Sequence, residues 1–230
     1  MLLKKHWKFT FVFTVIGLLH LSGSLINIHT LALYTKPLIV ISLAIYLIST
    51  TKLRGRFHKR ILTGLIFALV GDVLLSFVSE NEHYFGYGLV AFMLCHLLYI
   101  SAFYLDFKSA PELDKRGARL AIICCGIAAT AFFFYLRPHL GVMRVPVLAY
   151  ILVISFMVMM AAFRHQRVNS LSFILTIIGA ISFMLSDALL AYHKFVFEFP
   201  YANLFIMIAY LTAQYLITIG AVERKLLHNN

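Results

Sequence analysis

Residues 61–79 read ILTGLIFALVGDVLLSFVS, a long apolar run in which Asp72 is the one charged side chain. Residues 170–192, SLSFILTIIGAISFMLSDALLAY, form a second such run around Asp187. A charged side chain at the centre of a bilayer costs about 2.5–3.5 kcal/mol on the translocon insertion scale, so such residues are usually functional. The two runs therefore predict membrane-spanning helices that share a carboxylate site.

The whole chain has the composition of a membrane protein. Apolar residues make up 62% of it and charged residues 13%, with a mean hydropathy of +0.90, whereas soluble domains have about 25% charged residues. A hydrocarbon core of roughly 30 Å requires about 20 apolar residues per helix. Eight segments meet this requirement: 8–27, 31–50, 61–79, 84–105, 117–136, 142–163, 170–192 and 201–221. Since their connections are short, we expect an all-α membrane protein with one eight-helix transmembrane domain over residues 1–230.

The formal net charge of +11 follows the expected loops. Most of the Lys and Arg residues lie on one side of the membrane in this arrangement: Lys4, Lys5, Lys8, Lys52, Arg54, Arg56, Lys59, Arg60, Lys108, Lys115, Arg116, Arg119, Arg164, Arg167, Arg224 and Lys225. The other side holds Arg137, Arg144 and Lys194. Because cytoplasmic loops are enriched in basic residues, both termini are predicted to be cytoplasmic. Topology accounts for the charge, so we expect no nucleic-acid partner.

The phrases GDVLLSF at 71–77 and SDALLAY at 186–192 indicate an internal repeat. They are 115 residues apart, and each lies in the third of four expected helices. An even number of spans per half makes the repeats parallel, related by an axis along the membrane normal. The halves would be roughly residues 1–115 and 116–230. A chance match between apolar helices is the alternative, because the similarity outside the two phrases is faint.

Further polar residues lie on common faces of the expected helices. His96 and Tyr99 share one stripe, and Tyr210 and Gln214 share a face of the last span, as the 3.6-residue period requires. Lys36 lies about six residues, or roughly 9 Å, inside the second span. Their recurrence at similar depths favours a functional site.

Each of these residues also has a structural explanation. An intramembrane Tyr or His, such as Tyr150, can simply form interhelical hydrogen bonds. Lys36 can extend to the nearby interface or form a structural ion pair with the Asp residues. Gly71, Gly179 and Ser186 can allow close helix approach, which is our preferred interpretation of these three.

The order and spacing of these residues resemble the YhhN-like family of integral membrane lysoplasmalogenases. The matching set runs from the second to the eighth span: Lys36-Pro37, Gly71-Asp72 with Leu75, Phe85-x-x-Gly88-x-x-x-Phe92-x-x-x-His96-x-x-Tyr99, Tyr150, Gly179-Ala180-x-x-Phe183-x-x-Ser186-Asp187 and Tyr210-x-x-Ala213-Gln214. The resemblance implies hydrolysis of the vinyl ether bond of a lysoplasmalogen, giving a fatty aldehyde and glycerophosphoethanolamine or glycerophosphocholine. The expected partners are this lysophospholipid substrate and the surrounding membrane lipids.

Two buried carboxyl groups suit that chemistry. Acid hydrolysis of a vinyl ether protonates the alkenyl carbon beta to oxygen, and water captures the resulting oxocarbenium ion. The reaction needs one acid and one base or anion, as glycosidases do. We hypothesise that Asp72 and Asp187 share these two roles, with the assignment between them open.

The remaining motif residues are expected to support the reaction. Lys36 would bind the lipid phosphate or bias the titration of the two Asp residues. The others would line the cavity and orient water or substrate: His96, Tyr99, Tyr150, Ser186, Tyr210 and Gln214.

Other reaction classes have weaker support in the sequence. No HExxH motif and no G-x-S-x-G nucleophile elbow occur, so we expect neither a metal or other cofactor nor a serine lipase. The alternative function is a proton-coupled transporter, because midplane acids, an intramembrane Lys and parallel repeats also describe such carriers. Short loops and the lack of a transit-peptide pattern favour a bacterial inner membrane.

Overall fold

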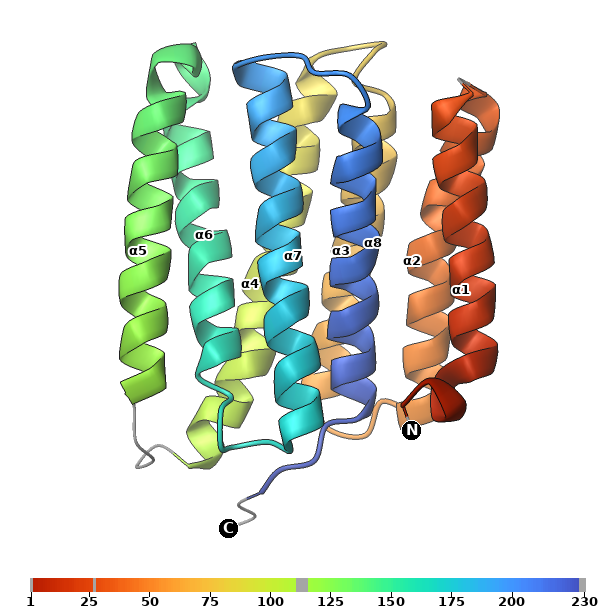
Figure 1. The fold of residues 1–230 in the computed structure, drawn as a ribbon, viewed down its shortest axis with the longest axis vertical. Helices are drawn as coiled ribbons and strands as arrows, with labels where there is room; N and C mark the ends of the chain where they lie inside the picture. Colours follow the sequence, from red (N-terminus) through yellow and green to blue (C-terminus); the bar gives the residue numbers. More distant parts are fainter. Residues whose placement is uncertain (1, 27, 111–115, 228–230) are drawn as a thin grey trace.

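The computed structural model describes residues 2–26, 28–110 and 116–227, and this part of the chain forms a bundle of long helices (Figure 1). The helices are α1 (Leu2–Leu25), α2 (His29–Thr51), α3 (Arg56–Ser76), α4 (His83–Ser109), α5 (Arg116–Leu136), α6 (Arg144–Ala162), α7 (Ser170–Phe195) and α8 (Ala202–Val222). Two short 3₁₀ turns, η1 (Arg137–His139) and η2 (Gly141–Met143), connect α5 to α6. The expected all-α class is confirmed, and each expected span coincides with one helix.

Seven of these helices are long and apolar enough to cross a membrane. The exception is α3, because any membrane-length stretch of it contains Lys59, Arg60 and Asp72. Large apolar side chains such as Phe11, Ile45 and Ile127 are exposed on the outside of the bundle, as contact with lipid requires. The chain is therefore a multi-pass membrane protein.

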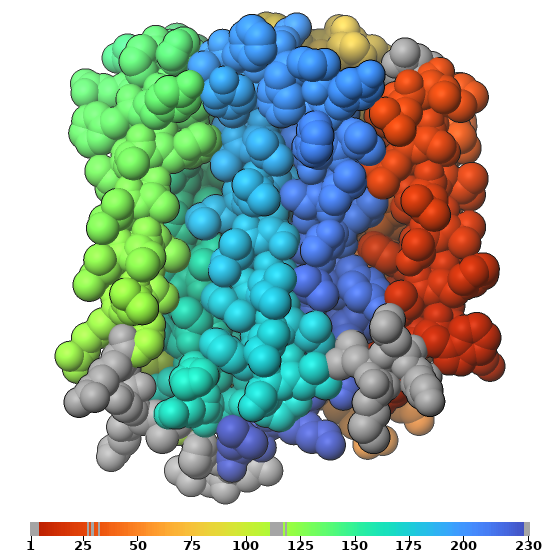
Figure 2. Space-filling model, viewed as in Figure 1, coloured from red at the N-terminus to blue at the C-terminus, as the bar shows by residue number. Residues whose placement is uncertain are grey.

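α1 begins and α8 ends at the same end of the bundle (Figure 1). We call this the basic end, because residues 52–55, 163–169 and 223–227 lie there with most of the loop Lys and Arg residues. The other, distal end is formed by residues 77–82, 137–143 and 196–201. In the space-filling view, α7 and α8 cover the middle of one face, with α5 at one edge and α1 at the other (Figure 2).

Small residues allow the central helices to approach closely. A Cβ added to Gly71 would lie 2.7 Å from the ring of Phe92, and one added to Gly179 would lie 2.9 Å from Ile217. Both contacts are shorter than carbon atoms tolerate, so α3 meets α4, and α7 meets α8, with no room for larger side chains. The preferred interpretation of these two glycines is confirmed.

Two basic residues at the basic end are buried rather than solvated. Arg164 is fully buried and donates hydrogen bonds to Asp106 Oδ2 (2.7 Å) and Ser172 Oγ (2.9 Å). Arg224 donates to the other oxygen of Asp106 from Nε, at 2.7 Å. Arg167 is also buried, and its guanidinium donates to the carbonyl oxygens of Phe107, near the end of α4, and Phe163, directly after α6. These contacts join α4, the α6–α7 loop and the end of α8, a structural use of loop charge that topology did not indicate.

Candidate active site

Two cavities meet at Asp187. The apolar pocket has a volume of about 370 Å³ and lies among α3 to α7, with walls that include Phe132, Ile151 and Met184. The polar cavity, of about 550 Å³, is lined by residues of α1, α2, α3, α4, α7 and α8 and contains both Asp72 and Asp187. Five residues line both spaces: Leu75, Phe85, Phe92, Asp187 and Leu190. Asp187 is thus the one carboxylate on the wall that both cavities share.

Asp72 is held on both oxygens within the polar cavity. It lies near the end of α3 and is almost fully buried. Lys36 Nζ, from α2, lies 3.3 Å from Oδ1, and the Tyr210 hydroxyl, from α8, donates to Oδ2 at 2.6 Å. A buried carboxylate needs such partners, since an unpaired charge there is very costly. The site therefore gives each carboxyl oxygen of Asp72 a partner.

The hydrogen-bond chain continues from Asp72 into the centre of the bundle. Gln214 Nε2 donates to the Tyr210 oxygen at 3.2 Å, and Gln214 Oε1 accepts from the Tyr99 hydroxyl at 2.8 Å. Each donated hydrogen in this series of hydrogen bonds points toward Asp72, so each hydrogen bond strengthens the next one. Tyr99, Gln214 and Tyr210 are fully or almost fully buried, which fixes the direction in which Tyr210 donates.

Asp187 has a different environment. Its Oδ2 accepts from the Tyr150 hydroxyl at 2.6 Å and lies 3.1 Å from His96 Nε2. Because the carboxylate oxygen accepts, His96 must carry its hydrogen on Nε2 for this contact to be a hydrogen bond. In the described part of the chain no side chain donates to Asp187 Oδ1, and no Lys or Arg pairs with this carboxyl group. The free oxygen and the partial exposure of the side chain leave Asp187 accessible from the cavities.

His96 is packed so that only one ring nitrogen is used. It is fully buried, and its ring lies edge-on to Phe183 with the centroids 4.6 Å apart. Its Nδ1 is buried without a hydrogen-bond partner among the residues that the structure describes. Packing against Phe183 thus holds the ring in place, with Nε2 2.9 Å from the Tyr150 hydroxyl and 3.1 Å from Asp187 Oδ2.

The structure brings the sequence-predicted residues into these two clusters. Lys36, Tyr210, Gln214 and Tyr99 join Asp72, while His96 and Tyr150 join Asp187. Ser186 lines the polar cavity, but its hydroxyl donates to the carbonyl oxygen of Ile206 at 3.0 Å, which ties α7 to α8. This bond agrees with the close-approach interpretation of Ser186.

Several cavity residues were not singled out from the sequence. His20, His193 and Lys194 line the polar cavity. Lys194 follows Asp187 by seven residues, a spacing that puts both on one face of a helix and that could have identified it. The apolar pocket gave no sequence signal, because its Ala, Ile, Phe and Met residues are ordinary components of membrane helices.

No group of three or more His, Cys, Asp or Glu side chains is placed to hold a metal ion within the described ranges. The expectation of metal-independent chemistry stays a prediction, which activity in the presence of a strong chelator would test.

A model of the YhhN family matches residues 31–221, from α2 to the end of α8. The chain belongs to the YhhN family. Among its relatives, "Lysoplasmalogenase TMEM86A" of Bos taurus is 33% identical over 170 residues, which are 72% of this chain and 66% of the bovine protein. A Mycobacterium tuberculosis lysoplasmalogenase is 30% identical over 212 residues, covering 90% of this chain and 77% of that protein. The match thus spans just under two thirds of the length of the bovine relative.

"Lysoplasmalogenase TMEM86B" of Rattus norvegicus is 31% identical over 155 residues, covering 67% of this chain and 58% of the rat protein. No solved structure matches the chain. The family assignment, which the motif resemblance predicted, is confirmed.

Proposed function

We propose that this YhhN protein is a lysoplasmalogenase that hydrolyses the vinyl ether bond of alkenyl-glycerophosphoethanolamine or alkenyl-glycerophosphocholine. The observation that carries the proposal is the position of Asp187 on the wall shared by an apolar pocket and a polar cavity that also holds Asp72. The names of the relatives supply the reaction, and the two cavities supply a place for each end of its substrate.

The order of the cavities matches the order of groups in the substrate. An alkenyl chain would occupy the apolar pocket, whose lining is almost entirely hydrocarbon, while glycerol and phosphate would occupy the polar cavity. The vinyl ether lies between these two parts of the lipid and therefore beside Asp187. The carbon that must be protonated is on the chain side of the ether oxygen, and water attacks the adjacent carbon.

This order assigns the acid to Asp187. Its carboxyl proton goes to the alkenyl carbon beta to oxygen: the C=C π electrons form the new C–H bond, the O–H bonding pair stays on the Asp187 carboxylate, and a lone pair of the ether oxygen forms the C=O⁺ bond of the oxocarbenium ion. The Asp187 carboxylate that results accepts hydrogen bonds from Tyr150 and His96, which stabilise the charge. Tyr150 and His96 are positioning residues in this scheme.

Asp72 is assigned the role of anion and base. Its negative charge stabilises the oxocarbenium ion, and it removes a proton as water forms the new C–O bond. The hemiacetal then collapses: its hydroxyl proton returns to Asp187, the Asp72 proton passes to the departing glycerol oxygen, and the C–O bond breaks. Both residues regain their starting states, and the products are a fatty aldehyde and a glycerophosphodiester.

We also infer that the chain is one domain built from two parallel halves, residues 1–115 and 116–230. A shift of 115 residues relates α3 to α7 and α4 to α8, and the pairs α3–α4 and α7–α8 lie together at the centre of the bundle (Figure 1). Tyr99 and Gln214 are 115 residues apart and hydrogen-bond to each other, as equivalent residues beside a twofold axis do.

The basic end would face the cytoplasm, with both termini, in a bacterial inner membrane. Fusion of a reporter that is active only in the cytoplasm to the C-terminus would test this orientation, and a silent fusion in an otherwise folded protein would contradict it.

The experiment that tests the function uses purified protein in detergent. Incubation with a lysoplasmalogen in D₂O should release fatty aldehyde with one deuterium on the carbon next to the carbonyl, because Asp187 delivers the solvent-derived proton there. In H₂¹⁸O the label should enter the aldehyde and not the glycerol hydroxyl. A proton-coupled transporter would release no aldehyde, and aldehyde without the deuterium would contradict carbon protonation.

A further inference from the structure

The polar cavity is lined by a cationic side chain, Lys194, on the same face of α7 as Asp187. Lys194 lies seven residues after Asp187 on α7, which is almost two full turns, so the two share a face and are separated by about 10 Å along the axis. Both line the polar cavity. Side chains of a helix lean toward its N-terminus, so a Lys194 side chain released from its surface contact can extend toward Asp187.

The contacts of Lys194 in the structure are weak. Its Nζ lies 3.4 Å from Glu82 Oε1, and the Glu82 side chain is 89% exposed. Exposed pairs of this kind are worth about 0–1 kcal/mol, so a better anion can replace Glu82. The ammonium also lies 5.6 Å from the ring centroid of Phe85, which lines both cavities and keeps Lys194 over the cavity.

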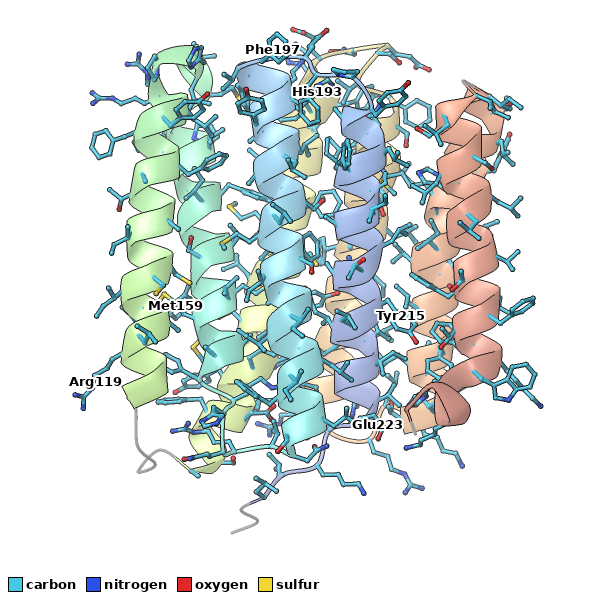
Figure 3. All side chains as sticks on the ribbon, viewed as in Figure 1. Arg119, Met159, His193, Phe197, Tyr215 and Glu223 are labelled. Carbon is cyan, nitrogen blue, oxygen red and sulfur yellow. The ribbon has the colours of Figure 1, made fainter. Side chains whose placement is uncertain are left out.

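The weak contacts of Lys194 distinguish it from Lys36, the other lysine that lines the polar cavity. Lys36 is already engaged by Asp72 at 3.3 Å and lies deeper in the bundle. Next to Lys194, His193 also lines the cavity, and its Nδ1 is buried without a partner among the described residues. His193 lies near the distal end of α7, far from Glu223 at the basic end (Figure 3). The distal part of the cavity thus offers an ammonium group to an anion, with the imidazole ring of His193 beside it.

We propose that Lys194, beside His193 on the cavity wall, binds the phosphodiester of the lysolipid head group and so sets the direction in which the substrate lies. This inference rests on the proposed function. Five bonds separate the vinyl ether oxygen from the phosphorus, or roughly 6 Å when extended. A Lys194 side chain that leans back over the 10 Å rise therefore reaches the phosphate when the vinyl ether lies beside Asp187.

Two anchors then determine the binding mode. The phosphate at Lys194 holds the head group toward the distal end, while the chain enters the apolar pocket, so the double bond is presented to Asp187 from one direction only. A neutral ether lipid such as a 1-alkenylglycerol would retain the contact of its chain with the apolar pocket and lose the contact of the phosphate with Lys194. Lys194 would therefore select phospholipids over neutral lipids.

The test compares two substrates and three variants of the full-length protein. A lysoplasmalogen carries the phosphate, and the matching 1-alkenylglycerol lacks it. For Lys194→Gln, we expect the KM for lysoplasmalogen to rise roughly ten- to a hundredfold, as loss of a charged hydrogen bond predicts. Its kinetics with 1-alkenylglycerol should stay at the wild-type level, and Lys194→Arg should keep most of the affinity for the phospholipid.

Glu82→Gln is the matched control. If Lys194 only tethers the α3–α4 loop through Glu82, this variant should reproduce the Lys194→Gln defect, and both variants should impair the two substrates equally. That result would overturn the inference while leaving the lysoplasmalogenase proposal intact. If the wild-type protein hydrolyses neither of the two substrates, the proposed function is refuted instead.

Discussion

Replacing Asp187 by Asn separates catalysis from binding. Asparagine has the shape of a protonated aspartic acid and is also neutral, and its amide oxygen can accept from the Tyr150 hydroxyl and His96 Nε2 as Oδ2 does. The variant therefore resembles the resting acid in every contact except the transferable proton. We expect it to fold and to bind the lysolipid normally.

The expected loss lies in turnover. A positioned general acid contributes about 10²–10⁴-fold, so kcat should fall by this factor with KM almost unchanged, a loss of about 3–5 kcal/mol of transition-state stabilisation. Aldehyde release by the purified variant in detergent measures this directly. Glu80→Gln is a suitable control, because this exposed carboxyl group in the α3–α4 loop lines neither cavity.

Asp72→Asn should behave differently, because it leaves Lys36 without its carboxylate partner. The lysine faces the polar cavity, so the cost is below that of a fully buried pair, at about 1–3 kcal/mol, and the melting temperature should fall along with turnover. The mechanism is wrong if Asp187→Asn retains near-normal kcat. Equal loss of stability in both variants would contradict the assignment of different charge states to the two carboxyl groups.

Two further predictions address the pocket and the basic end. Ala188→Phe fills part of the apolar pocket, so kcat/KM should fall several-fold for long alkenyl chains and less for short ones; the same change at Ala131, exposed on α5, should alter neither, and an unchanged chain-length profile in the pocket variant would count against this pocket as the chain site. At the basic end, burial favours a raised pKa for Glu223, but hydrogen bonds from Lys5 and His6 outweigh it and lower the pKa. A carboxyl group with a lowered pKa stabilises the fold above its ordinary pKa and loses this contribution as the pH falls through the folded-state value. Glu223→Gln should therefore lower the melting temperature at pH 7 and converge with wild type in acid; a constant difference at all pH values would contradict this.

The helices and their polar faces were predictable from the sequence because both depend on local properties. Apolar length fixed the spans, and the 3.6-residue period placed His96 and Tyr99 on one buried face of α4. The partners across the bundle were not predictable in this way. Nothing in the spacing indicates that Lys36 pairs with Asp72 and not with Asp187, because that choice depends on which faces of α2, α3 and α7 meet.

Buried charge at the basic end illustrates the same limit. Arg164 is a loop residue by sequence, and the positive-inside pattern accounts for it without any partner. Its pairing with Asp106 and Ser172 appears only when α4, α6 and α7 converge. Cavities are even harder to predict from the sequence, because their volume depends on where apolar side chains fail to fill the space between helices.

The repeat that we propose bears on the difference between the two carboxyl groups. Under the shift of 115 residues that aligns Asp72 with Asp187, Lys36 corresponds to Ile151 and His96 corresponds to Leu211. Lys36 lines the polar cavity and pairs with Asp72, whereas Ile151 lines the apolar pocket beside Asp187. One pair of equivalent positions thus supplies a cation to one carboxylate and hydrocarbon to the other. The proposed mechanism gives the two acids different roles, a proton donor beside the alkenyl chain and an anion beside the glycerol. The different residues at positions 36 and 151 give the two carboxyl groups the unequal surroundings that this division requires.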